Sequence, residues 1–446
     1  MSRKIIIYFL SIACIACQTK QDSKVTFELE LNNISENHYD DIFHHDLTTI
    51  PNLYTNKKIE SSDLYKHNIT YIPLETNDES LFADIYQLLI TDKAFIILDK
   101  KSKAILVFSH SGKFKFKIQR IGGGPEEYKI PKIVAFNKFS NSIEVLDNTR
   151  GVIQRYNADT GAYKSTLRAG FTMNSFFPIA ADKYLFHIDS YLFNDARYGQ
   201  VNGLEKQLLI AHETDKNGIK IISQHVNHIK NSGLLNFGSR NYLRYGADND
   251  ILISSTFNDT IYSFSQAGVR AKFVLDFGKD RIPSNFFPKS DFNKIKKRKD
   301  FDELPTPDSF WETRDFTYNW GTHQNRIVHS FYSKKRTKSI TVFNSDFMQA
   351  AKAVGYRPIG ANDTALVFKM EPQEVHILNN DILQNIDKFL ERQDIVANNS
   401  TRDSLYRKFI DENGYHFLFL SDRVDEEDNQ ILAFIQPNFE ILDNED

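Results

Sequence analysis

The chain has 446 residues, of which 41% are hydrophobic, and its formal net charge at pH 7 is −3. This content of apolar residues can bury a sizeable core and excludes a disordered protein. The near-neutral charge gives no general attraction to nucleic acid, so we expect no nucleic-acid partner. Phenylalanine (36) and tyrosine (20) are abundant, whereas methionine (4) and tryptophan (2) are few, which favours packed strands over a helical bundle.

Residues 1–17, MSRKIIIYFLSIACIAC, have the layout of a secretory signal peptide. Arg3 and Lys4 precede an apolar run from Ile5 to Ala16. A helix of this length spans roughly 18 Å, well short of the ~30 Å hydrocarbon core of a bilayer. We therefore do not expect a permanent transmembrane helix here.

Both cysteines of the chain lie in this leader. The ending Ile15-Ala16-Cys17 resembles a bacterial lipobox, with Cys14 where leucine is usual. The resemblance implies cleavage behind Ala16 and attachment of a lipid at Cys17, which would anchor the protein to the outer membrane on its periplasmic or surface face. The alternatives are an ordinary secretory signal cut nearby, and Cys14 as the acceptor.

From residue 65 onwards one layout recurs: an apolar strand, a polar turn, a second strand ending in an aromatic residue, and a turn with glycine. Two copies are AFIILDKKSKAILVFSHSGKFKFKI (94–118) and SIEVLDNTRGVIQRYNADTGAYKSTL (142–167), in which Asp99 and Asp147 are 48 residues apart. Looser copies cover 207–222, 251–275, 326–347 (with its turn at 344–346) and 359–378. Four short strands in each unit of about 40–50 residues are typical of a β-propeller.

The sequence therefore predicts an all-β fold, a six-bladed β-propeller over residues 65–378. A stack of β-sandwich domains is the rival, but it would not repeat the same order at blade length. We expect a tether with one strand (25–31) over 18–64, a short helical insertion over 279–319, and a helical segment with a closing strand over 379–446. The strands that can close the ring are NITYIPLE (68–75) and ILAFIQ (431–436), and the sequence does not choose between them.

The stretch QRIGGGPEEYK (119–129) contains three consecutive glycines. It fits neither the P-loop nor the dinucleotide-binding pattern, and two carboxylates beside the glycines would repel a phosphate. We interpret it as the connection between two blades, which would bring Arg120, Glu127 and Tyr128 near the mouth of the central channel. These three residues are our candidates for ligand binding, and blade connection alone is the alternative.

The segments PLET (73–76), DIYQLLI, AFIILD, VFSHSGKF and IGGGPEEY together resemble the six-bladed β-propeller lipoproteins of anaerobic Gram-negative bacteria, whose blades are similar to NHL-type repeats. The family's loop reads G-x-G-P-G-E-Y; here Gly123 stands at the variable place and Glu126 replaces the third glycine. The resemblance implies the fold and the envelope location, and it implies no reaction.

Residues that would indicate chemistry are scattered. His44 and His45 are adjacent and would point to opposite faces of a strand, and the other histidines lack the spacing of metal ligands. There is no G-x-S-x-G nucleophile motif. We expect Asp99 and Asp147 to accept backbone N–H groups. We therefore name no catalytic residue, metal ligand or cofactor.

Two classes of function remain. We favour a non-catalytic envelope protein that binds a glycan, a peptide or a partner protein on one propeller face. The alternative is a propeller hydrolase or lyase acting on polysaccharide or peptide, whose acidic pair would be assembled by the fold.

Overall fold

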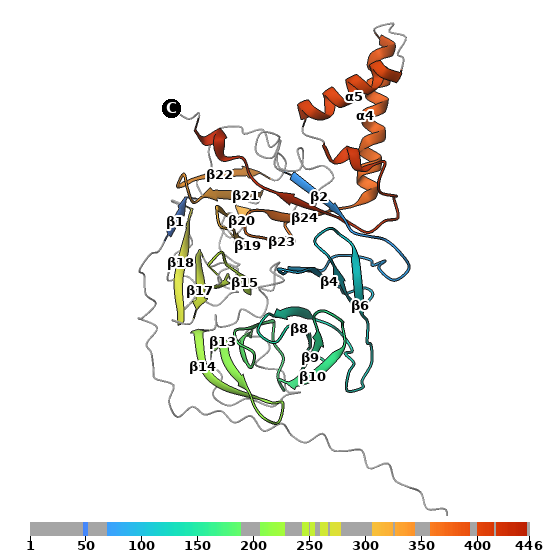
Figure 1. Cartoon of the computed structure of the whole chain (residues 1–446). Helices are drawn as coiled ribbons and strands as arrows, with labels where there is room; N and C mark the ends of the chain where they lie inside the picture. The colour runs from blue at the N-terminus through green and yellow to red at the C-terminus, as the bar shows by residue number, and fades with distance from the viewer. Residues whose placement is uncertain are drawn as a thin grey trace, which may run out of the picture.

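The computed structural model describes twelve segments of the chain: 48–51, 69–188, 206–227, 243–248, 250–254, 259–265, 268–277, 306–323, 326–343, 357–392, 399–413 and 416–443. The leader with Cys17, the strand expected at 25–31 and His44 and His45 lie outside them. Within the described segments six sheets are arranged in a ring around one axis (Figure 1). The predicted six-bladed β-propeller is confirmed.

Blades 1 to 3 follow one another along the chain, each as an antiparallel sheet of four strands. Blade 1 contains β3 (Gln87–Ile90), β4 (Phe95–Asp99), β5 (Ala104–Phe108) and β6 (Phe114–Ile118). Blade 2 contains β7 (Ile133–Asn137), β8 (Ser142–Asp147), β9 (Val152–Asn157) and β10 (Tyr163–Arg168). Blade 3 contains β11 (Ser175–Pro178), β12 (Lys183–His187), β13 (Lys206–Glu213) and β14 (Ile219–Asn227).

Blades 4 and 5 come next, and the outer edge of blade 4 carries an additional strand from the N-terminal part of the chain. Blade 4 contains β15 (Leu243–Tyr245), β16 (Ile251–Ile253), β17 (Thr260–Ser265) and β18 (Gly268–Asp276), and β1 (Thr48–Pro51) pairs with β18 in parallel. Blade 5 contains β19 (Thr306–Glu312), β20 (Phe316–His323), β21 (Arg326–Ser333) and β22 (Lys338–Phe343).

Blade 6 combines the two ends of the propeller. Its strands, from the axis outwards, are β23 (Gly360–Ala361), β24 (Leu366–Met370), β25 (Ile431–Ile435) and β2 (Ile69–Pro73). Both strands proposed from the sequence thus close the ring, because β2 pairs with β25 over its whole length. In Figure 1 the blue β2 lies beside the red β25.

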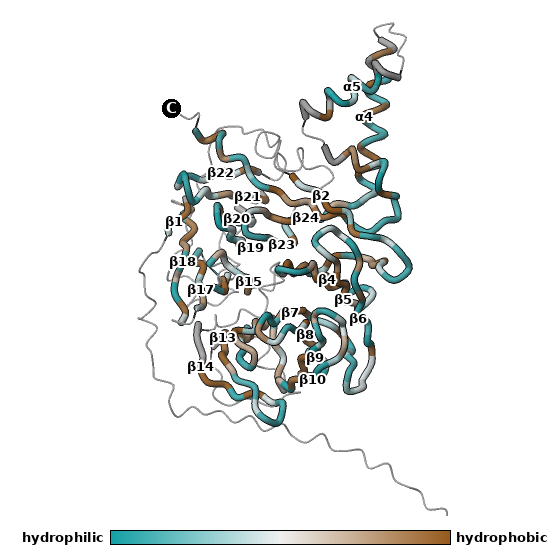
Figure 2. Tube along the Cα trace, in the orientation of Figure 1, coloured by the Kyte–Doolittle hydropathy of each residue, from teal (hydrophilic) through white to brown (hydrophobic). Residues whose placement is uncertain are grey.

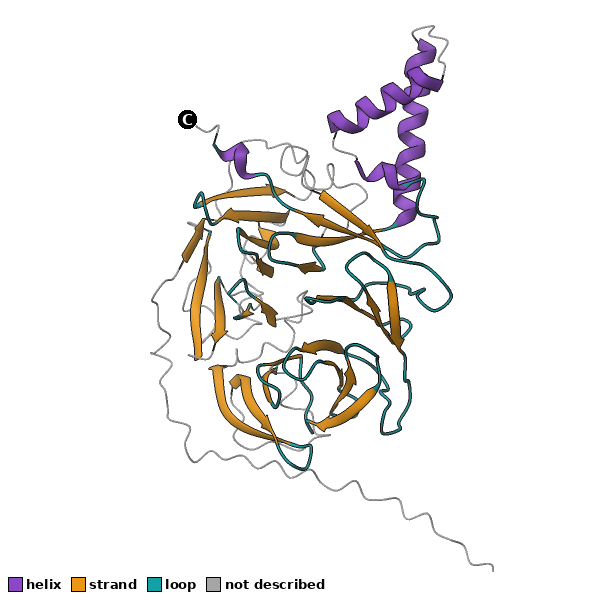
Figure 3. Cartoon of the chain, in the orientation of Figure 1, coloured by secondary structure: helices purple, strands orange, loops and turns teal. Residues whose placement is uncertain are grey.

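Helices occur between the second and third strands of blade 6. They are α4 (Pro372–Arg392), α5 (Asn399–Asn413) and the 3-10 helix η8 (His416–Leu420); another 3-10 helix, η9 (Phe439–Leu442), follows β25. Figure 3 shows α4 and α5 as a hairpin that stands away from the sheets. Among the described residues, no helix is both long and apolar enough to cross a membrane.

Neighbouring blades pack face to face, which explains the sequence of their central strands. Both faces of β4 and β5 are buried, so FIILD and AILVF are nearly continuous apolar runs without alternation. The buried apolar side chains form clusters that each join two adjacent blades. Figure 2 shows this concentration of hydrophobic residues in the blade strands.

The alternating strand directions give the ring two different faces. The first strands of neighbouring blades contact one another around the axis, as β3 does with β7 and β7 with β11. We call the face with the blade-to-blade loops the connection face, and the opposite one, where first strands end, the turn face. The glycine loop after β6 is on the connection face, and the ends of β11, β15 and β19 are on the turn face.

Two sequence assignments differ from the structure. The copy expected over 359–378 contains the paired strands β23 and β24 but no strand after them, because the chain enters α4 at Pro372 and the third strand of the blade is β25. Proline is favoured in the first turn of a helix, where its missing N–H costs no hydrogen bond. Residues 306–319, which we assigned to an insertion, form β19 and the beginning of β20.

The fifth copy forms the expected hairpin, in which a turn at residues 334–337 joins β21 to β22 and Thr337 has a φ of 53°. The turn expected at 344–346 lies outside the described residues.

Candidate functional site

The glycine loop is held by hydrogen bonds of its own. Glu127 Oε2 accepts the Gly124 N–H at 2.7 Å, and the Gly122 N–H donates to the Tyr128 carbonyl at 3.0 Å. A phosphate cradle depends on N–H groups that are available to the ligand. Here both are used by the loop, which agrees with a structural connection from β6 to β7.

Blade 2 fixes the same loop from the other side. Gln154 Nε2 donates to the Glu127 carbonyl at 2.8 Å, and the Tyr156 hydroxyl donates to the Glu126 carbonyl at 2.9 Å. No positive φ occurs at Glu126, so replacing the family's third glycine introduces no left-handed backbone there. The loop is therefore tied to the strands of the blade that it enters.

The three residues predicted to bind a ligand have different surroundings. Tyr128 is completely buried and its hydroxyl donates to the Lys103 carbonyl at 2.8 Å. Glu127 is partly buried and engaged within the loop, as described above. Arg120 reaches the surface, with 40% of its side chain exposed, and pairs with Glu126. Ligand binding at these residues stays a prediction, and Arg120 is the one whose side chain is accessible.

Asp99 and Asp147 are equivalent residues of blades 1 and 2 that connect each blade to the loop before it. Asp99 accepts the Ala83 N–H at 2.8 Å, and Asp147 accepts the Lys129 N–H at 2.7 Å. Each carboxylate also accepts an N–H from the turn that follows its strand. The prediction that these aspartates accept backbone N–H groups is confirmed.

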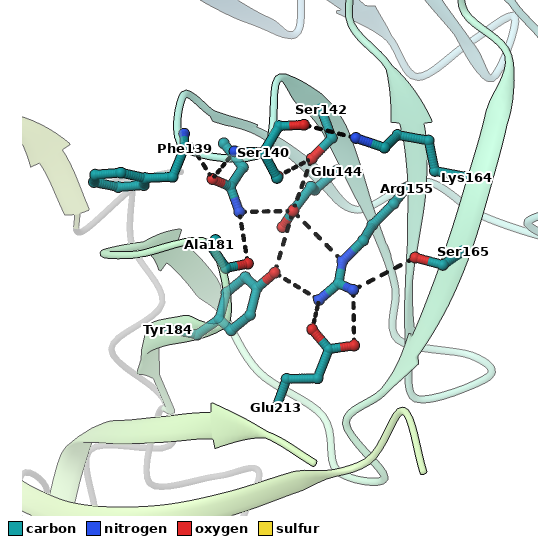
Figure 4. Close-up of polar contacts among 11 residues, drawn as sticks. Phe139, Ser140, Ser142, Glu144, Arg155, Lys164, Ser165, Ala181, Tyr184 and Glu213 are labelled. Atoms are coloured by element: carbon teal, nitrogen blue, oxygen red, sulfur yellow. Dashed lines mark hydrogen bonds and ion pairs between the residues drawn. The ribbon is translucent and has the colours of Figure 1, made fainter. Parts of the chain in front are cut away.

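A buried ionic network joins blades 2 and 3 (Figure 4). Glu144 on β8 has no exposed surface, and its Oε1 accepts from Asn137 Nδ2 at 3.0 Å and from the Tyr184 hydroxyl at 3.1 Å. Arg155 on β9 lies with its Nε 3.5 Å from Glu144 and donates two hydrogen bonds to Glu213, of 2.9 and 2.8 Å. Such an enclosed network orders the two blades against each other and is closed to a ligand.

A second network joins blades 4 and 5 around Lys272. Its ammonium contacts Asp248 and Asp250 at 3.0 Å each and Glu312 at 2.8 Å. Desolvation opposes the charge of Lys272, but Glu312 and Asp250 outweigh it, so the net effect raises the pKa of this lysine. The lysine is therefore a buried cation whose charge is compensated.

The first strands of blades 3, 4 and 5 bring aromatic side chains together near the axis. Phe177 on β11 and Tyr245 on β15 contact each other edge to face, with ring centroids 4.6 Å apart. Tyr245 is 43% exposed, yet desolvation raises its pKa to about 12, and the Glu144 carboxylate adds to the rise. Tyr245 thus presents an exposed aromatic surface near the axis, while neighbouring protein atoms desolvate its hydroxyl.

Arg244, the residue before Tyr245, points to the opposite side of β15 and reaches blade 5. Its guanidinium lies over the ring of Trp311 on β19, with the carbon Cζ 4.2 Å from the ring centroid. We call Phe177, Arg244, Tyr245 and Trp311 the axial cluster. It lies toward the turn face, at the end of the ring opposite to the glycine loop.

The sequence analysis did not find the axial cluster, because its members come from three blades and share no spacing. One signal was present: the two tryptophans of the chain, Trp311 and Trp320, lie close together in the sequence, the first inside the segment that we took for an insertion and the second directly after it. Both carry an arginine on the ring, since Arg357 lies over Trp320 with Cζ 4.1 Å from the centroid.

Metal ligands do not gather in the described part of the chain: no three His, Cys, Asp or Glu side chains there are arranged to hold an ion. His110, His329 and His376 each lie within hydrogen-bond distance of a protein oxygen. His329, for example, is buried and its Nδ1 lies 2.8 Å from the Tyr318 hydroxyl.

The ring of six four-stranded blades, closed by strands from both ends, defines the protein as a six-bladed β-propeller. The chain belongs to the family described as "Domain of unknown function (DUF4934)", whose model matches residues 47–436. A comparison with curated proteins gave no match.

One of three similar solved structures supports the fold. A protein of Bacteroides fragilis, described as a candidate exported protein, has a TM-score of 0.61 at 17% identity and covers 88% of this chain and 100% of its own. A DUF4221 family member from Bacteroides vulgatus has a TM-score of 0.45 at 10% identity, covering 84% and 98%. Virginiamycin B lyase from Staphylococcus aureus has a TM-score of 0.34 at 14% identity, covering 67% and 80%. At these identities the likeness concerns the fold alone.

Proposed function

We propose that this propeller is a non-catalytic binding protein of the cell envelope, exported through residues 1–17 and held at the outer membrane by a lipid on Cys17. Its ligand is a glycan, a peptide or a segment of a partner protein that enters along the axis from the turn face.

The observation that carries this proposal is Tyr245 of the axial cluster. Exposed aromatic side chains on innermost strands are unusual in a blade otherwise packed through apolar contacts, and Tyr245 combines 43% exposure with a desolvated hydroxyl. Ligand sites are concave, rich in aromatic side chains and equipped with a few polar groups that fix orientation. Phe177, Trp311 and Arg244 supply the aromatic and polar neighbours of such a site.

The envelope location rests on the leader, whose basic start, apolar run and final cysteine resemble those of a lipoprotein signal. Labelling cells with a radioactive fatty acid tests it directly. The full chain should incorporate the label, and the Cys17→Ser variant should not. Label retained by Cys17→Ser and lost from Cys14→Ser would move the anchor to Cys14.

Binding is tested by thermal unfolding of the full chain in detergent, in the presence of oligosaccharides and of short peptides. A ligand at a hundred times its dissociation constant should stabilise the folded chain by about 2.7 kcal/mol. Tyr245→Ala should abolish the shift. Phe419→Ala is the matched control, because Phe419 is an exposed aromatic residue (42%) in the 3-10 helix η8, outside the axial cluster.

The same mixtures decide between a binding protein and an enzyme. A ligand that shifts unfolding and is recovered unchanged after prolonged incubation supports binding. Recovery of cleaved product would replace the proposal by a propeller hydrolase or lyase.

A further inference from the structure

The buried cations of the two networks described above are both paired with carboxylates. Arg155 faces Glu144 and Glu213, and Lys272 faces three acids. Arg244 differs: desolvation is what lowers its pKa, to about 10, and no carboxylate of the described residues compensates it. The guanidinium stays charged at neutral pH and finds no counter-ion among the described residues, a state that is costly in a protein interior.

The polar contacts of Arg244 are correspondingly few. Its Nη1 donates one long hydrogen bond, 3.4 Å, to the Phe310 carbonyl, while its Nε is buried and has no acceptor in the described structure. The indole Nε1 of Trp311, the residue on which Arg244 is stacked, is also buried without an acceptor. Two N–H donors at one junction between blades 4 and 5 are thus unsatisfied, although buried donors are nearly always paired.

We propose that Arg244 and Trp311 form an anion site for a carboxylate group of the ligand, and this inference rests on the proposed function of the axial cluster. The carboxylate supplies the missing counter-ion and accepts the two N–H groups.

A carboxylate fits this junction better than a phosphate does. The site offers a single positive charge, and a guanidinium presents its donors in a planar fork that matches the two oxygens of one carboxylate. A phosphate dianion in an enclosed space would require a second cation. The group can belong to an acidic sugar or to the C-terminus of a peptide, and these two sources share the same chemistry.

The test is thermal unfolding of the full chain in detergent with matched pairs of probes. D-Glucuronate is compared with D-glucose, and acetyl-dialanine with its C-terminal amide. We expect the charged member of one pair to raise the unfolding temperature and its neutral partner to have no effect. The pair that responds identifies the source of the carboxylate.

Arg244→Met should abolish this shift and, without ligand, should be at least as stable as the wild type, because it removes an unpaired charge. Arg168→Met is the control, since Arg168 is exposed on β10, and it should keep the full shift. Trp311→Phe keeps the stacked ring but lacks the N–H, so it should bind the carboxylate more weakly. If Arg244→Met does not fold, Arg244→Lys, which keeps the charge but loses the fork, should bind at least about tenfold more weakly.

The inference is overturned if neither charged probe shifts the wild type, if the neutral probes act equally well, or if Arg244→Met keeps the shift. A result that refutes the carboxylate site can be told apart from one that refutes the proposed function. If a neutral glycan or peptide stabilises the wild type and Tyr245→Ala abolishes this effect, the binding function is supported and only the carboxylate site is refuted.

Discussion

Gly122 leaves room for the Glu127 carboxylate, since a Cβ at this position would lie 2.1 Å from Glu127 Oε2. We expect Gly122→Ala to displace the carboxylate from the Gly124 N–H and to lower the free energy of unfolding by about 1–3 kcal/mol. Gly123→Ala is the control, because the nearest atom to its Cβ would be Lys129 Cε at 3.9 Å. Thermal unfolding measures both, and equal losses would show that Glu127 does not explain the glycine.

Glu144 should make stability depend on pH. Burial raises the pKa of its carboxyl group, although the charge of Arg155 opposes the rise. Between the ordinary and the raised pKa the folded chain binds a proton that the unfolded chain releases, so stability falls as the pH rises through this range. The variant Glu144→Gln has no ionisable group at this position, so it lacks this pH dependence.

We therefore expect Glu144→Gln to gain stability relative to the wild type as the pH increases from about 5 to 8. Denaturant unfolding across this range measures the difference. Glu126→Gln, an exposed carboxylate in the glycine loop, should follow the wild-type curve, and parallel curves for all three proteins would contradict the assignment.

At the scale of single residues, the sequence predicted the interactions that depend on neighbours nearby in the chain. The roles of Asp99 and Asp147 follow from their place at the end of a strand, where a carboxylate accepts the N–H groups of turns. The burial of Tyr128 and the pairing of Arg244 with Trp311 depend on neighbours that lie far along the chain. Neither feature can therefore be predicted from the type of the side chain or from its spacing in the sequence.

Between elements, Lys272 should be among the most sensitive positions. Lys272→Met leaves the carboxylates of Asp250 and Glu312 buried with their principal cation removed, and breaking a buried pair in this way costs about 3–5 kcal/mol. Lys335→Met, at an exposed position in the next blade, is the matched control. The difference is measured by denaturant unfolding at neutral pH, and a loss no larger than that of the control would show that the acids find other partners.

The elements themselves were predictable where strands and turns alternate regularly. Blades 1 and 2 agree with the two copies read from the sequence, and Gly112 and Gly161 have the positive φ expected of hairpin turns. At the looser third copy the residue with positive φ is Asn217 rather than Gly218, since asparagine also tolerates this conformation. In blade 6 the helices separate two strands of one sheet, and repeat length alone could not reveal that separation.

At the scale of the whole molecule, ring closure brings two strands from distant parts of the sequence together in blade 6. β2 and β25 are far apart in sequence but pair over five residues, from Ile69 with Ile435 to Pro73 with Ile431. The turn at Gly112 adds a contact, because the Glu75 N–H donates to the Gly112 carbonyl at 2.8 Å. The order of the blades could be read from the repeats, whereas the choice of closing strands depends on contacts between the two ends.

Two truncated chains test this closure. A chain that begins at residue 66 loses β1 but keeps β2, and it should still unfold in one cooperative transition. A chain that begins at residue 75 also loses β2, so the edge of β25 is left unpaired, and open edges favour aggregation. We expect this shorter chain to lose cooperative unfolding and to associate, as measured by calorimetry and light scattering. A synthetic peptide of residues 66–76 should restore the transition by adding the missing strand, and indistinguishable behaviour of the two truncated chains would show that β2 does not close the ring.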